Sequence, residues 1–156
     1  EIDAAWTVEP WVSLLENKAG GKVYLEESSI WPGGRYATTL LVARRKFLEE
    51  NPSLVKKFLE VHSEITEWIA QNPAPAKKML NEEIEKETHK ALPEAVLSAA
   101  FERVHFTVMP LRETVEKQAQ SAFQAGFLKK NPDLSGLFDL RLLNELRGEK
   151  KLEPVT

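Results

Sequence analysis

Three short segments near the start of the chain carry the hydrophobic pattern of β-strands. Residues 2–6 (IDAAW) are small and apolar, residues 22–27 (KVYLEE) alternate, and residues 37–45 (ATTLLVARR) are apolar and partly β-branched. Alternation and β-branched runs of this length are typical of strands. The pattern therefore predicts three strands, of which the third is well buried.

The spacing of apolar residues becomes helical after residue 50. Asn51 and Pro52 supply a helix N-cap and a first-turn proline, and Asn72-Pro73 ends the helix that follows. Its apolar positions lie on one face. They are Leu54, Val55, Phe58, His62, Ile65, Trp68 and Ile69.

The same spacing predicts five more helices. One begins near Pro10 and ends at Gly20-Gly21, two follow Pro93 and Pro110, and two cover about residues 75–86 and 139–147. Strands followed by a run of helices predict an α/β layer structure. We expect five aromatic side chains in its core, namely Trp68, Phe101, Phe106, Phe123 and Phe127.

The composition narrows the possible classes of function. The chain has 156 residues, of which 42% are hydrophobic and 29% charged, and this suits about one domain. Its net charge of -3 gives no indication of the basic face that nucleic acids require. No apolar run approaches the ~18 residues that span a bilayer. Because the chain begins inside a strand-like segment, we expect it to be part of a longer protein.

Residue types that carry common chemistry are sparse. The chain has no cysteine, which excludes thiol catalysis, disulfides and cysteine-based zinc sites. Glycine-rich phosphate loops and a nucleophile elbow are absent from the sequence. The three histidines are scattered, and the acidic run over residues 82–87 has the spacing of a solvated helix face. We therefore predict no catalytic residue, no metal and no cofactor.

Four segments, taken in order, resemble a known family. They are IDAAWTVEPW, WPGGRYATTLLVARRKFLEENP, ITEWIAQNPAPAKKMLN and DLSGLFDLRLLNEL. Together they resemble the C-terminal portion of a periplasmic substrate-binding protein of an ABC importer, from the aliphatic sulfonate, nitrate and taurine family. The resemblance covers Ile2 to about Leu146 and implies the C-terminal part of a two-lobed, type II periplasmic-binding-protein fold of the α/β class.

The resemblance also implies an organisation and a function. Residues 1–36 are expected to form the end of the second lobe with a ligand-facing turn, and residues 37–156 the interlobe crossover strand and a C-terminal helical part. The expected function is capture of a small organic anion by lobe closure, without chemistry, and its delivery to a permease in the membrane. The expected location is periplasmic or otherwise extracytoplasmic, with or without a lipid anchor, and the isolated chain is expected to self-associate through unpaired strand edges.

Six residues are candidates for contact with the ligand. They are Trp6, Thr7, Glu9, Arg35, Thr38 and Thr39. The first three lie at or just after the C-terminal end of the first predicted strand, at the edge where ligands gather in open α/β sheets. For two of these residues a structural role competes with ligand contact, because Trp6 can fill a core corner and Glu9 can cap the helix after Pro10.

The other candidates lie further along the chain. Arg35 follows two glycines and carries a guanidinium suited to sulfonate oxygens, although most arginines are simply exposed. Thr38 and Thr39 offer hydroxyl groups near the expected hinge. Trp11 lies within a helical pattern, and we assign it to the core.

Two other functions stay open from the sequence. One is a pyrimidine-precursor-binding or synthase-like relative on the same fold. The other is a non-catalytic helical module that binds a partner protein.

Overall fold

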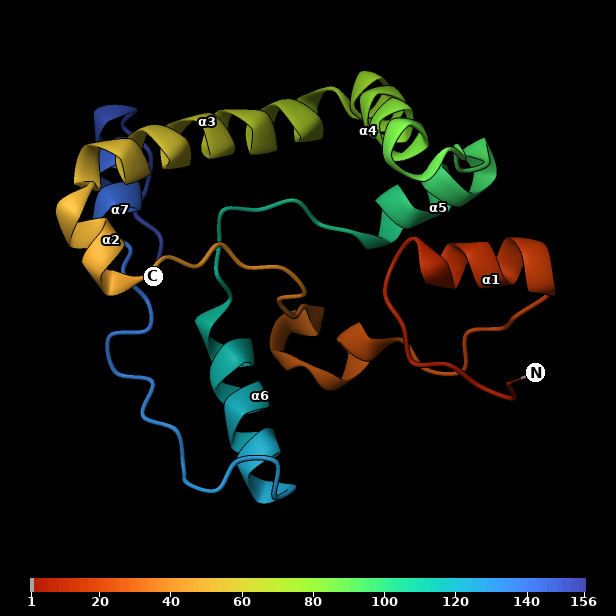
Figure 1. Ribbon diagram of the computed structural model, residues 1–156, viewed down its shortest axis with the longest axis horizontal. Helices are drawn as coiled ribbons and strands as arrows, with labels where there is room; N and C mark the ends of the chain where they lie inside the picture. Colours follow the sequence, from red (N-terminus) through yellow and green to blue (C-terminus); the bar gives the residue numbers. More distant parts are fainter. Residues whose placement is uncertain (1) are drawn as a thin grey trace. The chain divides into compact units, whose positions relative to one another are not determined.

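The computed structural model describes residues 2–156, and its regular elements are all helical (Figure 1). The α-helices are α1 (Trp11–Ala19), α2 (Arg45–Glu50), α3 (Pro52–Gln71), α4 (Pro73–Thr88), α5 (Glu94–Arg103), α6 (Arg112–Gln124) and α7 (Arg141–Glu149). Two short 3-10 turns, η1 (Glu27–Ile30) and η2 (Pro32–Gly34), lie between α1 and α2.

Local sequence features set most of the helix ends. Helix α1 follows Pro10 and ends at Gly20, whose φ of 67° is left-handed. Helices α3 and α4 each begin with a proline. Between them the Asn72 side chain donates a hydrogen bond to the Trp68 carbonyl at 3.0 Å. The six predicted helices are therefore confirmed, whereas α2 was not predicted, and its first residue, Arg45, had been assigned to the third strand.

The predicted α/β class is wrong, because no β-strand occurs anywhere in residues 2–156. All three predicted strands, at residues 2–6, 22–27 and 37–45, are irregular or extended, and the last of them runs into α2. Leu40, Leu41 and Val42 are exposed rather than buried. A strand requires the backbone of a neighbour, and these segments do not form a hydrogen-bonded ladder with one another.

The chain forms two compact units, each built from separated stretches of sequence. The first comprises Glu1–Leu25 and Thr66–Thr107, and the second Glu26–Ile65 and Val108–Thr156. Helix α3 contributes its residues up to Ile65 to the second unit and the remainder to the first. The expected division at residue 36 concerns the organisation of lobes and stays a prediction.

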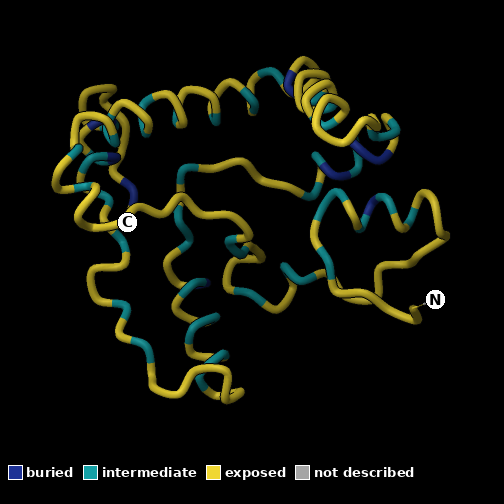
Figure 2. The backbone as a smooth tube through the Cα atoms, viewed as in Figure 1, coloured by how far each residue is buried: buried dark blue, intermediate teal, exposed yellow. Residues whose placement is uncertain are grey.

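The core of the first unit lies where α5 packs against α1 and α4. Four apolar residues are buried there, and Figure 2 shows dark positions on α5. They are Ala76, Val96, Leu97 and Ala100. Asn81 fastens the segment between α4 and α5, because its side chain accepts from the Leu92 N–H at 2.8 Å and donates to the Leu92 carbonyl at 3.0 Å.

The core of the second unit includes α7 and the chain end. Leu143, Leu146 and Val155 are buried. The Asn144 side chain accepts from the Val155 N–H at 2.8 Å and donates to its carbonyl at 2.9 Å. These two bonds hold the last residues of the chain against α7.

The aromatic residues do not form the core that the sequence predicted. Trp68, Phe106 and Phe127 are exposed, as is Trp11, while Phe101 and Phe123 are half-buried. The buried apolar residues in the described part of the chain are aliphatic. Helical spacing identifies an apolar face, but it does not determine whether another element covers that face.

Candidate functional site

The turn before α1 carries three of the six candidate residues, all in the first unit. The Trp6 side chain is 76% exposed, so it does not fill a core corner. Thr7 beside it is half-buried. Glu9 has a side chain only 8% exposed and is the most enclosed of the three.

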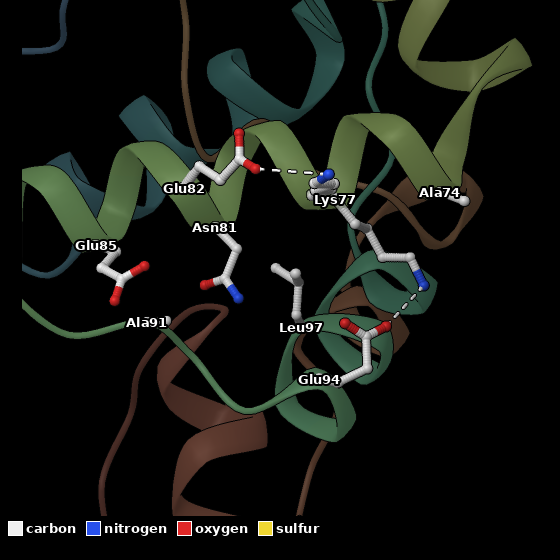
Figure 3. A pocket seen from close by; sticks show the side chains of 9 residues that line it. Ala74, Lys77, Asn81, Glu82, Glu85, Ala91, Glu94 and Leu97 are labelled. Carbon is white, nitrogen blue, oxygen red and sulfur yellow. Dashed lines mark ion pairs between the residues drawn. The ribbon is translucent and has the colours of Figure 1, made fainter.

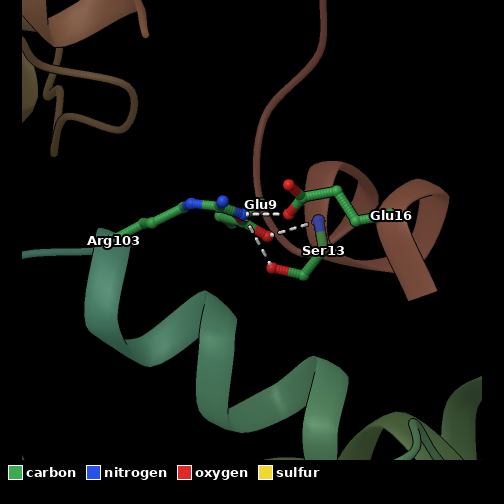
Figure 4. Close-up of polar contacts among 4 residues, drawn as sticks. All are labelled: Glu9, Ser13, Glu16 and Arg103. Carbon is green, nitrogen blue, oxygen red and sulfur yellow. Dashed lines mark hydrogen bonds and ion pairs between the residues drawn. The ribbon is translucent and has the colours of Figure 1, made fainter. Parts of the chain in front are cut away.

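Glu9 is enclosed because it takes part in a cluster with α5 (Figure 4). A single guanidinium nitrogen, Nη1 of Arg103, donates to Glu9 Oε1 at 3.0 Å, to Glu16 Oε2 at 2.7 Å and to the hydroxyl of Ser13 at 3.2 Å. Ser13 is the one fully buried residue of α1 among those described. The cluster joins the turn, α1 and the end of α5.

The carboxylates of this cluster stabilise the charged guanidinium. The hydrogen bond to Glu16 is the largest effect on the pKa of Arg103, burial opposes it, and the bond to Glu9 adds to it, so that the pKa lies above its ordinary value. Two carboxylates against one guanidinium leave one excess negative charge. Glu9 therefore cannot attract an anion, but it can fix the geometry of the turn.

Glu9 also caps α1. Its Oε2 accepts the backbone N–H of Ser13 at 3.2 Å, while the N–H groups of Trp11 and Leu14 donate to Val8 and Pro10. A helix N-terminus favours an anion only where its N–H groups point at open space. This observation favours the capping role of Glu9, and it leaves the Trp6 indole and the Thr7 hydroxyl as the donors of the turn.

The remaining three candidates lie in the second unit. Arg35, Thr38 and Thr39 are exposed. Because these three residues and the first three belong to different units, whether all six candidates form one site stays a prediction.

The segment that carries Arg35 is anchored on both sides. Trp31 stacks on Tyr36, with ring centroids 6.0 Å apart, and donates its indole N–H to Glu27 at 2.6 Å. Lys117 of α6 lies over the Trp31 ring at 5.2 Å from its centroid. Burial, followed by the charges of Glu27 and Glu26, raises the pKa of Tyr36. The anchors hold the backbone while the Arg35 side chain extends outward.

A hollow of about 240 Å³ lies between α4 and α5, away from the predicted residues (Figure 3). Lys77 points toward Glu94 at 3.7 Å and donates to Ser98 at 2.8 Å. Asn81 makes the two bonds to Leu92 described above. The Lys77 and Asn81 side chains in the hollow are therefore already paired within the chain, and charges of both signs line the hollow. The hollow is for this reason a poor candidate for an anion site.

Residues 2–156 contain no cluster of three or more histidine, aspartate or glutamate side chains arranged to hold a metal ion. None of the helices in this part of the chain has the length and apolarity needed to cross a membrane.

Comparison with known protein families identifies a family for the chain. The model of the NMT1-like family matches residues 1–82, which is more than half of the 156 residues. The chain belongs to the NMT1-like family. No curated protein and no solved structure matches significantly.

The NMT1-like family is of the periplasmic binding-protein type, and its members are typically binding proteins. Membership supports a solute-binding protein in general and suggests an extracytoplasmic location. It supports the predicted sulfonate, nitrate and taurine relationship only coarsely.

Sequence reasoning missed the residue that organises the turn. Glu9, Ser13 and Glu16 lie within the segment matched by the NMT1-like model, whereas Arg103 lies outside it. Arg103 is 94 positions from Glu9 in the sequence. The one local indication was a basic residue in the last turn of a predicted helix, a position that usually complements the helix dipole.

Proposed function

We propose that the chain is part of the solute-binding component of an ABC transporter and that it captures a small organic anion such as an aliphatic sulfonate. In this proposal the ligand is enclosed by lobe closure, is not altered chemically, and is passed to a membrane permease. Membership of the NMT1-like family carries the proposal. The exposed Trp6 and the adjacent Thr7, on a turn fixed by Arg103, support it.

Each candidate residue has a role in the proposal. Trp6 supplies an apolar wall and an N–H donor, and Thr7 supplies a hydroxyl. Arg35 pairs with the anionic group through its planar fork of donors, and Thr38 and Thr39 donate hydroxyl hydrogen bonds beside it. Glu9 belongs to the structural cluster rather than to the anion contacts.

Isothermal titration calorimetry against ethanesulfonate, taurine, nitrate and an aminopyrimidine tests the proposal. We expect binding of at least one of the first three compounds. Trp6→Ala is expected to weaken it at least about tenfold, which corresponds to ~1.4 kcal/mol. Trp11→Ala is the matched control, because Trp11 is also an exposed tryptophan but lies on α1 beyond the turn.

Four outcomes contradict the proposal. Absence of binding to every compound overturns it. Equal losses of affinity in Trp6→Ala and Trp11→Ala would show that Trp6 has no specific role in binding. Binding of the aminopyrimidine alone favours the pyrimidine-precursor relative instead, and turnover of that compound would indicate an enzyme.

A further inference from the structure

Along the part of α3 that lies in the second unit, one side carries an apolar stripe that the described residues of that unit leave largely exposed. The stripe consists of Leu54, Phe58, Val61 and Ile65, which are between 42% and 59% exposed. The intervals between them are four, three and four residues, which is the heptad spacing of a coiled-coil seam.

Helix α3 contacts α7 through a different side. Lys56 bonds to Glu145 and to Glu149, the latter at 2.9 Å. Lys56 is two residues from Phe58, which places it on the opposite side of the helix. The Lys56 contacts with α7 therefore lie on a different side of α3 and leave its apolar stripe outward.

We propose that a second copy of this chain covers the stripe, with the two α3 helices antiparallel. The pattern is self-complementary in that orientation. Leu54 of each copy lies opposite Ile65 of the other, and Phe58 lies opposite Val61. This gives four apolar layers, each combining one a position and one d position of the heptad.

The charges beside the stripe favour this orientation. Lys57 and Glu64 both occupy the flanking g position of the heptad. In the antiparallel pair g positions face g positions, so Lys57 of each copy meets Glu64 of the other, and the two-fold axis makes the contact twice. A parallel pair would place Lys57 opposite His62 and Glu64 opposite Ile69, with no pair of opposite charges.

Both side chains are free enough to make this contact. Lys57 is 71% exposed and bonds to Glu60 on its own helix at 2.7 Å. Glu64 is 54% exposed and pairs with Lys150 at 3.3 Å. Exposed pairs of this kind hold their geometry weakly, so the groups can turn toward a partner helix.

Sedimentation equilibrium over a range of concentrations tests the proposal. The chain is expected to shift from monomer to dimer. Lys57→Glu and Glu64→Lys are each expected to weaken the dimer by about fivefold, because each places like charges at both contacts. The double variant K57E/E64K restores opposite charges and should recover the original affinity. Lys86→Glu is the matched control, since Lys86 makes the same kind of exposed bond to a glutamate three residues away.

Phe58→Ser tests the apolar layers separately and should abolish the dimer while circular dichroism keeps its helical signal. A chain that stays monomeric at every concentration overturns the proposal. A dimer unaffected by Phe58→Ser uses another surface, and failure of the double variant to recover overturns the antiparallel register. None of these three results is compatible with the proposed interface.

Discussion

The Glu9 carboxylate is nearly enclosed, and the Arg103 guanidinium compensates its charge. Replacing that guanidinium leaves the enclosed Glu9 charge without its cation. The resulting loss of stability should lie between the loss for an exposed ion pair and the loss for a fully buried one. We expect Arg103→Met to lower the free energy of unfolding by about 2 kcal/mol in urea titrations followed by circular dichroism.

A double-mutant cycle separates this coupling from general damage. The combined variant Arg103→Met, Glu9→Gln should lose less stability than the sum of the single variants. Arg141→Met is the comparison, because Arg141 pairs with Asp139 but is largely exposed, and its effect should be smaller. Additive losses would mean that Glu9 and Arg103 are not energetically coupled.

Tyr36 offers a residue-level test by pH. Burial, then Glu27 and Glu26, raise its pKa above 10.0. The chain has two tyrosines, so a Tyr24→Phe variant isolates Tyr36 for titration by phenolate absorbance. Its midpoint should lie above 10.0, and Glu27→Gln should bring it closer to that value.

The sign of the linked stability follows from the raised pKa of Tyr36. The folded chain binds the phenol proton more tightly than the unfolded chain. The stability that this gives is present below the unfolded pKa and is lost as pH rises through the folded pKa. A midpoint at or below 10.0 would show that the phenol is not enclosed.

At the scale of elements, the helices were predictable and the strands were not. The ends of α1, α3 and α4 are encoded locally by proline, glycine and asparagine, whose preferences act within a few residues. Strand formation depends on a neighbour that lies elsewhere in the chain. Residues 37–45 carry a strand-like composition, yet they remain extended and exposed up to the start of α2.

Two glycines, one at a helix end and one inside a helix, allow a matched test of how glycine affects helix stability. Gly20 ends α1 at a φ of 67° and a Cβ there meets open space, so Gly20→Ala should cost about 1 kcal/mol through backbone strain alone. Gly148 lies inside α7, also with open space around a Cβ, and Gly148→Ala should stabilise by roughly 0.5–1 kcal/mol. Thermal unfolding should show shifts of opposite sign; shifts of the same sign would contradict the assigned helix end.

At the scale of the whole molecule, the candidate site was only partly predictable. Trp6 and Thr7 could be proposed from a local pattern of residues. The cluster that fixes their turn could not, because it depends on Arg103, which approaches Glu9 only after α5 has packed against α1. Likewise the exposure of Trp68 and the burial of Leu97 depend on which helices meet, and helical spacing alone does not specify this.

The division of the chain into two units gives the last prediction. Leu97 is 2% exposed in the first unit and Leu143 is 6% exposed in the second. Truncating either to alanine should cost roughly 3 kcal/mol, since each leaves a cavity in a packed core. If the units unfold separately, each truncation lowers the unfolding midpoint of the unit that contains it and leaves the other unit unchanged.

Tryptophan fluorescence can report on each unit. Trp31 belongs to the second unit and the other three tryptophans to the first. In a Trp31→Phe background, Leu97→Ala should lower the urea midpoint more than Leu143→Ala. With Trp31 as the sole tryptophan the order should reverse. Equal shifts in both backgrounds would show that α3, which contributes residues to both units, makes the chain unfold as one cooperative structure.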